Sequence, residues 1–308
     1  MERAHERPGG DGMSMDILIS FPEGQALAGN LAARTGLPLH QVALHRFPDG
    51  ESLVRLEAAP ERAIIVRSLD RPNDKLVELQ FLAGALRERG AKELTLIAPY
   101  LAYMRQDMEF RPGEVVSQRI MGRWLGGLFD RVITVDPHLH RTHDLGEVFP
   151  GGRCAALSAG PLLGAWARAQ GSAEQGWIIL GPDEESEHLV QGAAESAGVT
   201  GIVGLKVRRG DHDVSVGLPD GTVLAGRTVL FVDDIISSGS TLIDAAKVAY
   251  AHGAARVLAA TVHAVFPMER LEAFRAAGIE SVVSTDGIPH PTNAIGLSDL
   301  IADCLAVL

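Results

Sequence analysis

The sequence predicts an α/β protein of two domains, each with a mainly parallel β-sheet flanked by helices. Short apolar runs alternate with longer amphipathic stretches, which is typical of strands buried on both faces and joined by crossover helices. The pattern occurs about twice and is interrupted at 147–160, where Gly, Pro and small residues accumulate. At 308 residues the chain is long enough for two domains of ordinary size.

The expected elements follow this pattern in order. Residues 1–14 are polar and Gly-rich, so we expect a disordered tail there and exclude it from the fold. For the first domain, 15–153, the predicted strands are 16–20, 62–68, 93–100 and 131–136, and the predicted helices are 24–35, 74–89 and 117–128. For the second domain, 154–308, the strands are 176–182, 228–234, 256–266 and 281–287, and the helices are 186–197, 241–252 and 268–277. We allow for the last helix packing back on the first domain.

Composition excludes several classes of partner. The 28 Lys and Arg residues are outnumbered by 39 Asp and Glu residues, for a formal net charge of −11, so no general basic face for nucleic acid is expected. No apolar run approaches the length of a membrane span, so we expect no membrane partner. Cys154 and Cys304 lie far apart and have no metal-type spacing, which favours a reduced, cytoplasmic protein.

The stretch VLFVDDIISSGSTL, 229–242, combines a strand, two acids and a small-residue loop. We expect 229–232 to be the strand, with Asp233 and Asp234 emerging at its end and Ser237 to Thr241 forming a loop that feeds a helix. Ligands bind beyond the carboxyl ends of strands in such sheets, and a helix N-terminus favours phosphate. The two carboxylates could hold vicinal hydroxyls or hydrated Mg²⁺. A structural interpretation, in which Asp234 ends the strand and Ser240 caps the helix, stays open.

The same stretch resembles the ribose-5-phosphate-binding signature of type I phosphoribosyltransferases and of ribose-phosphate pyrophosphokinases (PRPP synthetases). From Met15 to Leu308 the chain resembles the second family in order, through seven further segments: HRFPDGES (45–52), RPNDKLVEL (71–79), APYLAYMRQD (98–107), TVDPHLHR (134–141), GPDEESEHLV (181–190), LKVRRGDHDVSV (205–216) and VSTDGIPHPTNAI (283–295). Several separated segments at consistent spacing are more specific than a phosphate loop alone. The resemblance implies two tandem phosphoribosyltransferase-like domains.

The resemblance implies two groups of nucleotide contacts. In HRFPDGE, Phe47 would offer a flat apolar face for a base, and Asp49 and Glu51 would offer acceptors. From the residues alone, a Pro-Asp-Gly turn between two strands is the better interpretation of this segment. In YMRQD, Arg105 and Gln106 would contact the nucleotide and its phosphates, with Asp107 orienting them; an ordinary strand end is the alternative.

The family resemblance also implies a magnesium site. His138 matches the family's Asp-x-His and would reach the Mg-ATP phosphates, while Asp183, at the end of the run WIIL, would be a ligand of a second Mg²⁺ near the ribose. Asp136 could orient His138 through its other ring nitrogen. A zinc site of His138, His140 and His143 lacks a diagnostic spacing, so we interpret His140 and His143 as surface or supporting residues. Glu184 to Glu187 are interpreted as a solvated helix start, where negative charge is favourable.

Catalysis is implied by LKVRRGDHDV. Lys206 and Arg208 match the family's Lys-x-Arg catalytic loop, where positive charge stabilises the diphosphoryl group in transfer, and Arg209 could assist. A charged, exposed hairpin explains the same residues structurally. The ribose 5-phosphate contacts implied by the signature are Asp233, Asp234, Ser237, Ser238, Gly239, Ser240 and Thr241.

The resemblance implies transfer of the β,γ-diphosphoryl group of ATP to the 1-hydroxyl of ribose 5-phosphate, with Mg²⁺ as cofactor and PRPP and AMP as products. It also implies a homo-oligomer built from dimers. Two alternatives are a non-catalytic regulatory homologue and a transferase acting on a different sugar phosphate or on PRPP itself. Several residues depart from the bacterial pattern: Ser237 replaces the usual Asp of the phosphate loop, Met108 and Glu109 replace basic residues, and 56–63 lacks a Ser-x-Arg pattern. The segment after Asp107 is closer to the archaeal subtype.

Overall fold

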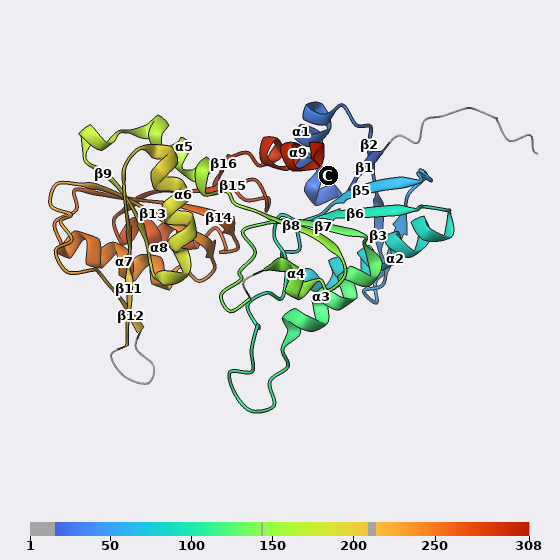
Figure 1. The fold of residues 1–308 in the computed structure, drawn as a ribbon, viewed down its shortest axis with the longest axis horizontal. Coiled ribbons are helices and arrows are strands. Elements are labelled where there is room, and N and C mark those ends of the chain that lie inside the picture. Colours follow the sequence, from blue (N-terminus) through green and yellow to red (C-terminus); the bar gives the residue numbers. More distant parts are fainter. Residues whose placement is uncertain (1–15, 143, 209–213, 308) are drawn as a thin grey trace, which may run out of the picture.

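The structure is a computed structural model that describes residues 16–142, 144–208 and 214–307. Figure 1 shows two α/β halves side by side along the long axis of the molecule. The predicted tail at 1–14, His143 and Arg209 lie outside the described residues. No helix in the described ranges is both long enough and apolar enough to cross a lipid bilayer.

The first half is built on a six-stranded sheet whose paired strands are all parallel. Its strand order is β2 (Leu39–Gln41), β1 (Ile17–Ser20), β5 (Arg62–Val66), β6 (Glu93–Ile97), β7 (Arg131–Val135) and β8 (Arg153–Leu157). Its helices are α1 (Gln25–Thr35), α2 (Pro72–Glu88), α3 (Ser117–Leu128) and the single turn α4 (Leu145–Val148). The central strands are buried along nearly their whole length, as continuous apolar runs predict.

The second half repeats this architecture. Its parallel sheet has the order β10 (Thr200–Val203), β9 (Trp177–Gly181), β13 (Thr228–Ile236), β14 (Arg256–Ala264), β15 (Ile279–Thr285) and β16 (Asn293–Ile295). The helices are α5 (Gly160–Gln170), α6 (Glu187–Ala197), α7 (Ser240–Ala251), α8 (Arg270–Ala276) and α9 (Ser298–Ala306). Two parallel sheets flanked by helices confirm the predicted fold class.

Two antiparallel hairpins stand apart from the sheets. The first joins β3 (Ala43–Arg46) to β4 (Ser52–Arg55), and the second pairs β11 (Leu205–Arg208) with β12 (Val214–Gly217). The second hairpin projects from the second half of the molecule beside α7 (Figure 1). Segments of this kind can present side chains that the buried strands of a parallel sheet cannot.

The two halves share a buried core. One cluster of buried side chains includes Leu18 and Val135 from the first sheet and Ile179 and Val232 from the second. His263 of β14 is 1% exposed, and its Nε2 donates a hydrogen bond to the carbonyl oxygen of Val135 at 2.9 Å. Because a buried polar group is costly without a partner, this bond favours the packing that places β14 of the second sheet next to the end of β7 in the first.

The last helix crosses to the first half. α9 packs against α1 (Figure 1), and Nε of Arg34 on α1 donates to Asp299 on α9 at 2.8 Å. The expected domain boundary at 153/154 falls inside β8, which pairs with β7 in the first sheet. The chain therefore enters the second half only after Leu157, and returns to the first half at its last helix.

Candidate active site

A cavity of about 300 Å³ lies at the carboxyl ends of the strands, where the two halves meet. Arg105 and His138 come from the first half, while Asp183 and the end of β13 come from the second. The full lining is Arg105, His138, Pro182, Asp183, Glu185, Asp233, Asp234, Ile235, Ile236, Ser237, Ser238, Gly239, Thr241 and Leu242. Open parallel sheets bind their ligands at this edge, and most of the predicted site residues are among these.

The phosphate loop has the predicted strand-loop-helix geometry, with one correction. β13 continues to Ile236, so Asp233 and Asp234 lie within the strand and not after it, and Asp233 pairs with Thr261 of β14. The loop is then only Ser237 to Gly239, and α7 begins at Ser240. The N-cap of α7 is Gly239, with φ 71° and no side chain of its own, and Oγ of Ser238 accepts from the backbone N–H of Ser240 at 3.4 Å. The structural interpretation of Ser240 as a cap is therefore wrong.

The end of α7 is suited to an anion. Its first backbone N–H groups have no helical partner, the helix dipole favours negative charge there, and Ser237, Ser238 and Thr241 are exposed around it. Gly239 permits this turn because the left-handed conformation carries little cost without a Cβ. An added Cβ would also lie 2.3 Å from the ring of Phe274.

Two carboxylates with opposite pKa shifts lie beside the loop. Burial, followed by the charges of Asp234 and Asp183, raises the pKa of Asp233 well above its ordinary 3.8. Burial also acts to raise the pKa of Asp234, but the hydrogen bond and charge of His138 outweigh it and lower that pKa. Asp234 is therefore the ionised member, and Asp233 is the member whose ionisation a bound cation would favour.

His138 joins the two halves across the site. Its Nδ1 lies 2.7 Å from Oδ2 of Asp234, and its ring meets His140 edge to face with centroids 3.6 Å apart. His140 in turn lies 3.3 Å from Glu185, and burial lowers the pKa of His140, as does the neighbouring charge of His138. His140 contacts His138 directly and is half-buried, a position that a residue supporting His138 would have.

Two contacts that the sequence led us to expect are wrong: Asp136 with His138, and Asp107 with Arg105. Asp136 does not orient His138, since its Oδ2 accepts from the backbone N–H of Ala159 at 2.7 Å and its Oδ1 faces His188 at 3.3 Å. The left-handed backbone of Asp136, φ 37°, turns its carboxylate away. Asp107 accepts from Arg141, at 3.1 and 3.3 Å, and not from Arg105.

Gln106, the predicted residues of the β3–β4 turn and Ser240 are not among the residues that line the cavity. The amide of Gln106 donates to its own loop, at Met108 and Glu114. Phe47, Asp49 and Glu51 are exposed at the turn of the β3–β4 hairpin, which lies on the side of the first half remote from β13 (Figure 1). Lys206 and Arg208 belong to β11, but their side chains lie outside the described residues.

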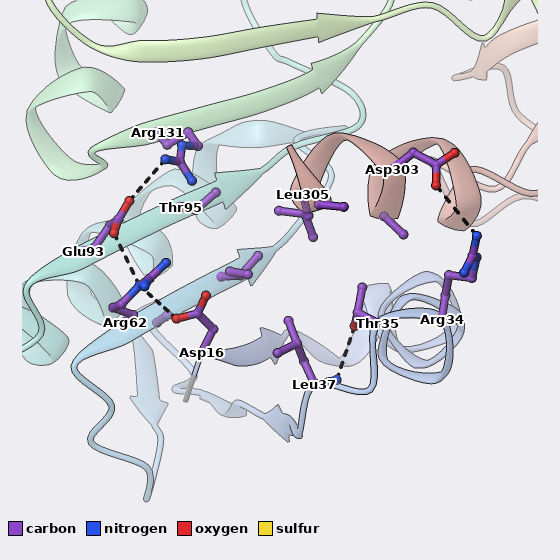
Figure 2. A pocket seen from close by; sticks show the side chains of 14 residues that line it. Asp16, Arg34, Thr35, Leu37, Arg62, Glu93, Thr95, Arg131, Asp303 and Leu305 are labelled. Atoms are coloured by element: carbon purple, nitrogen blue, oxygen red, sulfur yellow. Dashed lines mark hydrogen bonds and ion pairs between the residues drawn. The ribbon is translucent and has the colours of Figure 1, made fainter. Parts of the chain in front are cut away.

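A different cavity, of about 410 Å³, lies at the amino ends of β5, β6 and β7, between α1 and α9. Figure 2 shows arginines around it that are directed toward carboxylates. Arg62 lies 2.9 Å from Asp16, and Arg131 lies 3.4 Å from Glu93. Because these cations have carboxylate partners and the amino edge is not where such sheets bind ligands, we assign the cavity to packing.

The fold and the site define a class of protein: two tandem α/β domains, each with a parallel sheet, that meet at a cavity holding a Ser-Ser-Gly loop and two paired acids. A sequence model of the N-terminal domain of ribose phosphate pyrophosphokinase matches residues 17–127, and one of the phosphoribosyl synthetase-associated domain matches 219–303. The chain is 33% identical to the ribose-phosphate pyrophosphokinase of Methanopyrus kandleri over 94% of this chain and 98% of that relative. It is 35% identical to that of Halobacterium salinarum, over 94% and 100%. The chain therefore belongs to the ribose-phosphate pyrophosphokinase family.

A solved structure agrees with this fold. The phosphoribosylpyrophosphate synthetase of Mycobacterium smegmatis matches with a TM-score of 0.81, at 23% identity, over 95% of this chain and 98% of that one. At this identity the likeness concerns the fold alone. The predicted family is confirmed by the sequence relatives. The Methanopyrus and Halobacterium proteins are archaeal, which agrees with the expectation that the segment after Asp107 is closer to the archaeal subtype.

Proposed function

We propose that this protein is a ribose-phosphate diphosphokinase, which transfers the β,γ-diphosphoryl group of ATP to the 1-hydroxyl of ribose 5-phosphate. The hydroxyl oxygen forms a bond to the β-phosphorus, the bond from that phosphorus to the oxygen bridging the α-phosphate breaks, and the hydroxyl proton is released. PRPP and AMP are the products. The observation that carries this proposal is one cavity holding the Ser237–Gly239 loop, the acids of β13, and Arg105 and His138 of the other half.

Each of these groups has a role in alignment or charge neutralisation, on which phosphoryl transfer depends. The N-terminus of α7 and the loop hydroxyls would bind the 5-phosphate, and Asp233 and Asp234 would accept hydrogen bonds from the ribose hydroxyls. Arg105 would bind the nucleotide phosphates. Lys206 and Arg208 are proposed to stabilise the charge of the diphosphoryl group during transfer, a role carried by the family's sequence pattern.

The donor set fits Mg²⁺, which prefers oxygen ligands and retains water and substrate phosphates around it. Asp183 and Asp233 supply carboxylate oxygens at the cavity. Burial and the two neighbouring acids raise the pKa of Asp233, so a bound cation would favour its ionised form. We propose Asp183 and His138 as the residues that hold it. When bound, Mg²⁺ neutralises phosphate charge.

We further propose that the protein works in the cytoplasm as a homo-oligomer built from dimers, in which the nucleotide site is completed by a second copy. The exposed turn with Phe47, Asp49 and Glu51 lies away from the cavity of its own chain, and a copy placed against it would receive an aromatic face and two acceptors. Mixing two inactive variants, Phe47→Ala and Lys206→Ala, should then restore activity, because some sites would combine intact residues from both chains. Unchanged inactivity of a mixture that forms mixed dimers would contradict this arrangement.

The direct test measures AMP release from purified protein with Mg-ATP, with and without ribose 5-phosphate. We expect AMP only with the sugar, and a loss on the order of 10² or more in kcat for Lys206→Ala. Lys247→Ala is the matched control, since Lys247 is an exposed residue of α7 paired with Asp244. Binding of both substrates without AMP formation would instead indicate the regulatory homologue, and activity with another sugar phosphate alone would indicate the alternative transferase.

A further inference from the structure

We infer that a second cavity between the two halves binds a small aromatic carboxylate, that is, a flat ring that carries one negative charge. This cavity, which we call the Tyr100 cavity, has a volume of about 540 Å³, within the range of pockets that hold small organic ligands. Its walls come from the start of α2 and the segment after β6 in the first half, and from the segments after β14 and β15 in the second. None of the described residues that line it also lines the candidate active site.

Arg71 gives the Tyr100 cavity one unpaired positive charge. In the part of the chain that the structure describes, the guanidinium of Arg71 has no carboxylate within ion-pair distance. The acid of the same wall, Asp70, is neutralised by Nζ of Lys75 at 2.7 Å, and burial lowers the pKa of His290, which keeps its ring neutral. A guanidinium binds a carboxylate through two parallel hydrogen bonds. The charge balance therefore favours a ligand with a single carboxylate over a phosphate dianion.

Aromatic rings line the Tyr100 cavity from both halves. Tyr100 and Tyr103 come from the first half, and Phe266 and His290 come from the second. Within the described ranges the hydroxyl of Tyr100 makes no hydrogen bond, and burial raises the pKa of Tyr100, so this hydroxyl stays protonated and can donate to an oxygen of the ligand. Aromatic side chains bind a flat ring through offset and edge-to-face contacts, which favours an aromatic ligand over an aliphatic one.

Both walls are held in place by hydrogen bonds within the protein. In the first half, the hydroxyl of Tyr103 donates to Oδ1 of Asn73. In the second half, Nε2 of His290 donates to the carbonyl oxygen of Phe266 at 3.1 Å, and its Nδ1 accepts from the hydroxyl of Thr292 at 2.7 Å. A ligand would therefore meet side chains that are already ordered, which reduces the entropy lost on binding.

Two residues of the first wall also have strained backbones. Among the residues that the structure describes, positive φ outside glycine occurs at three positions, and Arg71 (φ 49°) and Tyr103 (φ 64°) are two of them. Conformations of this kind cost free energy and cluster at active sites and ligand sites, where the surrounding packing maintains them. The third, Asp136, closely precedes His138 of the candidate active site. The strained positions thus accompany the two cavities between the halves.

The test is a titration of the full-length protein with 2-naphthoate, followed by calorimetry, without nucleotide or sugar. We expect one site with a Kd of about 1 mM or tighter. 2-Naphthamide has the same rings without the charge and should bind at least about 10-fold more weakly. Decahydro-2-naphthoate has the charge without the aromatic rings and should bind about 2- to 10-fold more weakly.

Variants locate the bound probe. Arg71→Gln should weaken 2-naphthoate binding by roughly 10- to 150-fold, and Tyr100→Phe by at least about 2-fold, since each removes a hydrogen bond to a charged group. Arg123→Gln is the matched control, because Arg123 is exposed on α3, lies outside the cavity and has no carboxylate partner in the described ranges. Arg105→Gln changes the candidate active site and should leave the affinity for 2-naphthoate unchanged.

Three outcomes would overturn the inference: no binding of 2-naphthoate to the wild type, wild-type affinity in Arg71→Gln, or loss of binding in Arg105→Gln. Equal affinity for 2-naphthamide would also contradict it, because the charge of Arg71 would then have no role. Circular dichroism of each variant separates loss of the site from loss of the fold. Since the titration contains neither ATP nor ribose 5-phosphate, its result does not depend on the proposed function.

Discussion

A single added methyl group at Gly239 should disrupt the phosphate loop. Gly239 has φ 71°, a conformation that costs a residue with a Cβ roughly 1–2 kcal/mol. That Cβ would lie 2.3 Å from Cε1 and Cζ of Phe274, whose side chain is buried. Overpacking of this kind costs about 1–3 kcal/mol. Together these effects predict that Gly239→Ala lowers the free energy of unfolding by about 2–5 kcal/mol.

The assay is thermal unfolding combined with substrate kinetics. A loss of this size corresponds to a fall in Tm of roughly 4–20 °C for domains of this size, and the displaced loop should raise the KM for ribose 5-phosphate. Gly29→Ala is the matched control: Gly29 lies inside α1 with nothing near its added Cβ, so Ala there should stabilise the protein by about 0.5–1 kcal/mol.

A second variant tests the cause of the loss. Phe274→Leu removes the ring carbons that meet the new methyl group, so the double variant with Gly239→Ala should lose less stability than the sum of the two single losses. A Gly239→Ala protein with the wild-type Tm and KM would refute the reasoning. Strictly additive losses would show that the strain is in the backbone alone.

Three further predictions concern buried charges. Asp233→Asn should raise the free energy of unfolding at pH 7 in the absence of ligand. A carboxyl whose folded pKa is raised contributes stability fully below pH 3.8 and loses it as the pH rises through that folded pKa. In denaturant titrations from pH 4 to 8, the free energy of unfolding should therefore change less with pH for the variant than for the wild type. Glu78→Ala removes the carboxylate that lies 2.5 Å from the buried guanidinium of Arg67 and leaves Glu23, 2.9 Å away, as its remaining carboxylate partner. The variant should therefore lower the free energy of unfolding in urea, by less than the roughly 3–5 kcal/mol of a buried charge left without any partner. Burial lowers the pKa of His263 below its ordinary 6.5, so its contribution to stability is present above pH 6.5 and is lost as the pH falls through the folded pKa. His263→Gln should therefore make the free energy of unfolding fall less on acidification. An acid-unfolding midpoint equal to that of the wild type would contradict this prediction.

The fold could be predicted in its main elements because its signals are local. The central strands are continuous apolar runs, and the helix at 117–128 has the predicted bounds. Short elements give no such signal. The strand at 153–157 lies within the stretch interpreted as a break, and the β3–β4 hairpin corresponds only to the structural alternative for HRFPDGE. Residues at sheet edges are half-exposed and need few apolar side chains, so composition does not mark them.

In the candidate site, the identity of several residues could be predicted from the sequence, but the contacts between them could not. Each strand end could be predicted to carry a ligand-binding residue, and Arg105, His138, Asp183 and Asp233 do line one cavity. The contacts between these residues depend on how the two sheets pack, which no single segment encodes. Sequence places Glu185 in a solvated helix start, and its position near His140 follows only from the packing of the two halves.

The contact of α9 with α1 has a consequence for how the protein is made. α1 is complete by residue 35, but residues 298–306, which cover it, are synthesised some 270 residues later. At about 5–20 residues per second, roughly 14–54 s pass on the ribosome between the synthesis of α1 and the synthesis of α9, which packs against it. During that interval the nascent first half exposes a surface that chaperones can bind, and its final packing must follow the synthesis of α9.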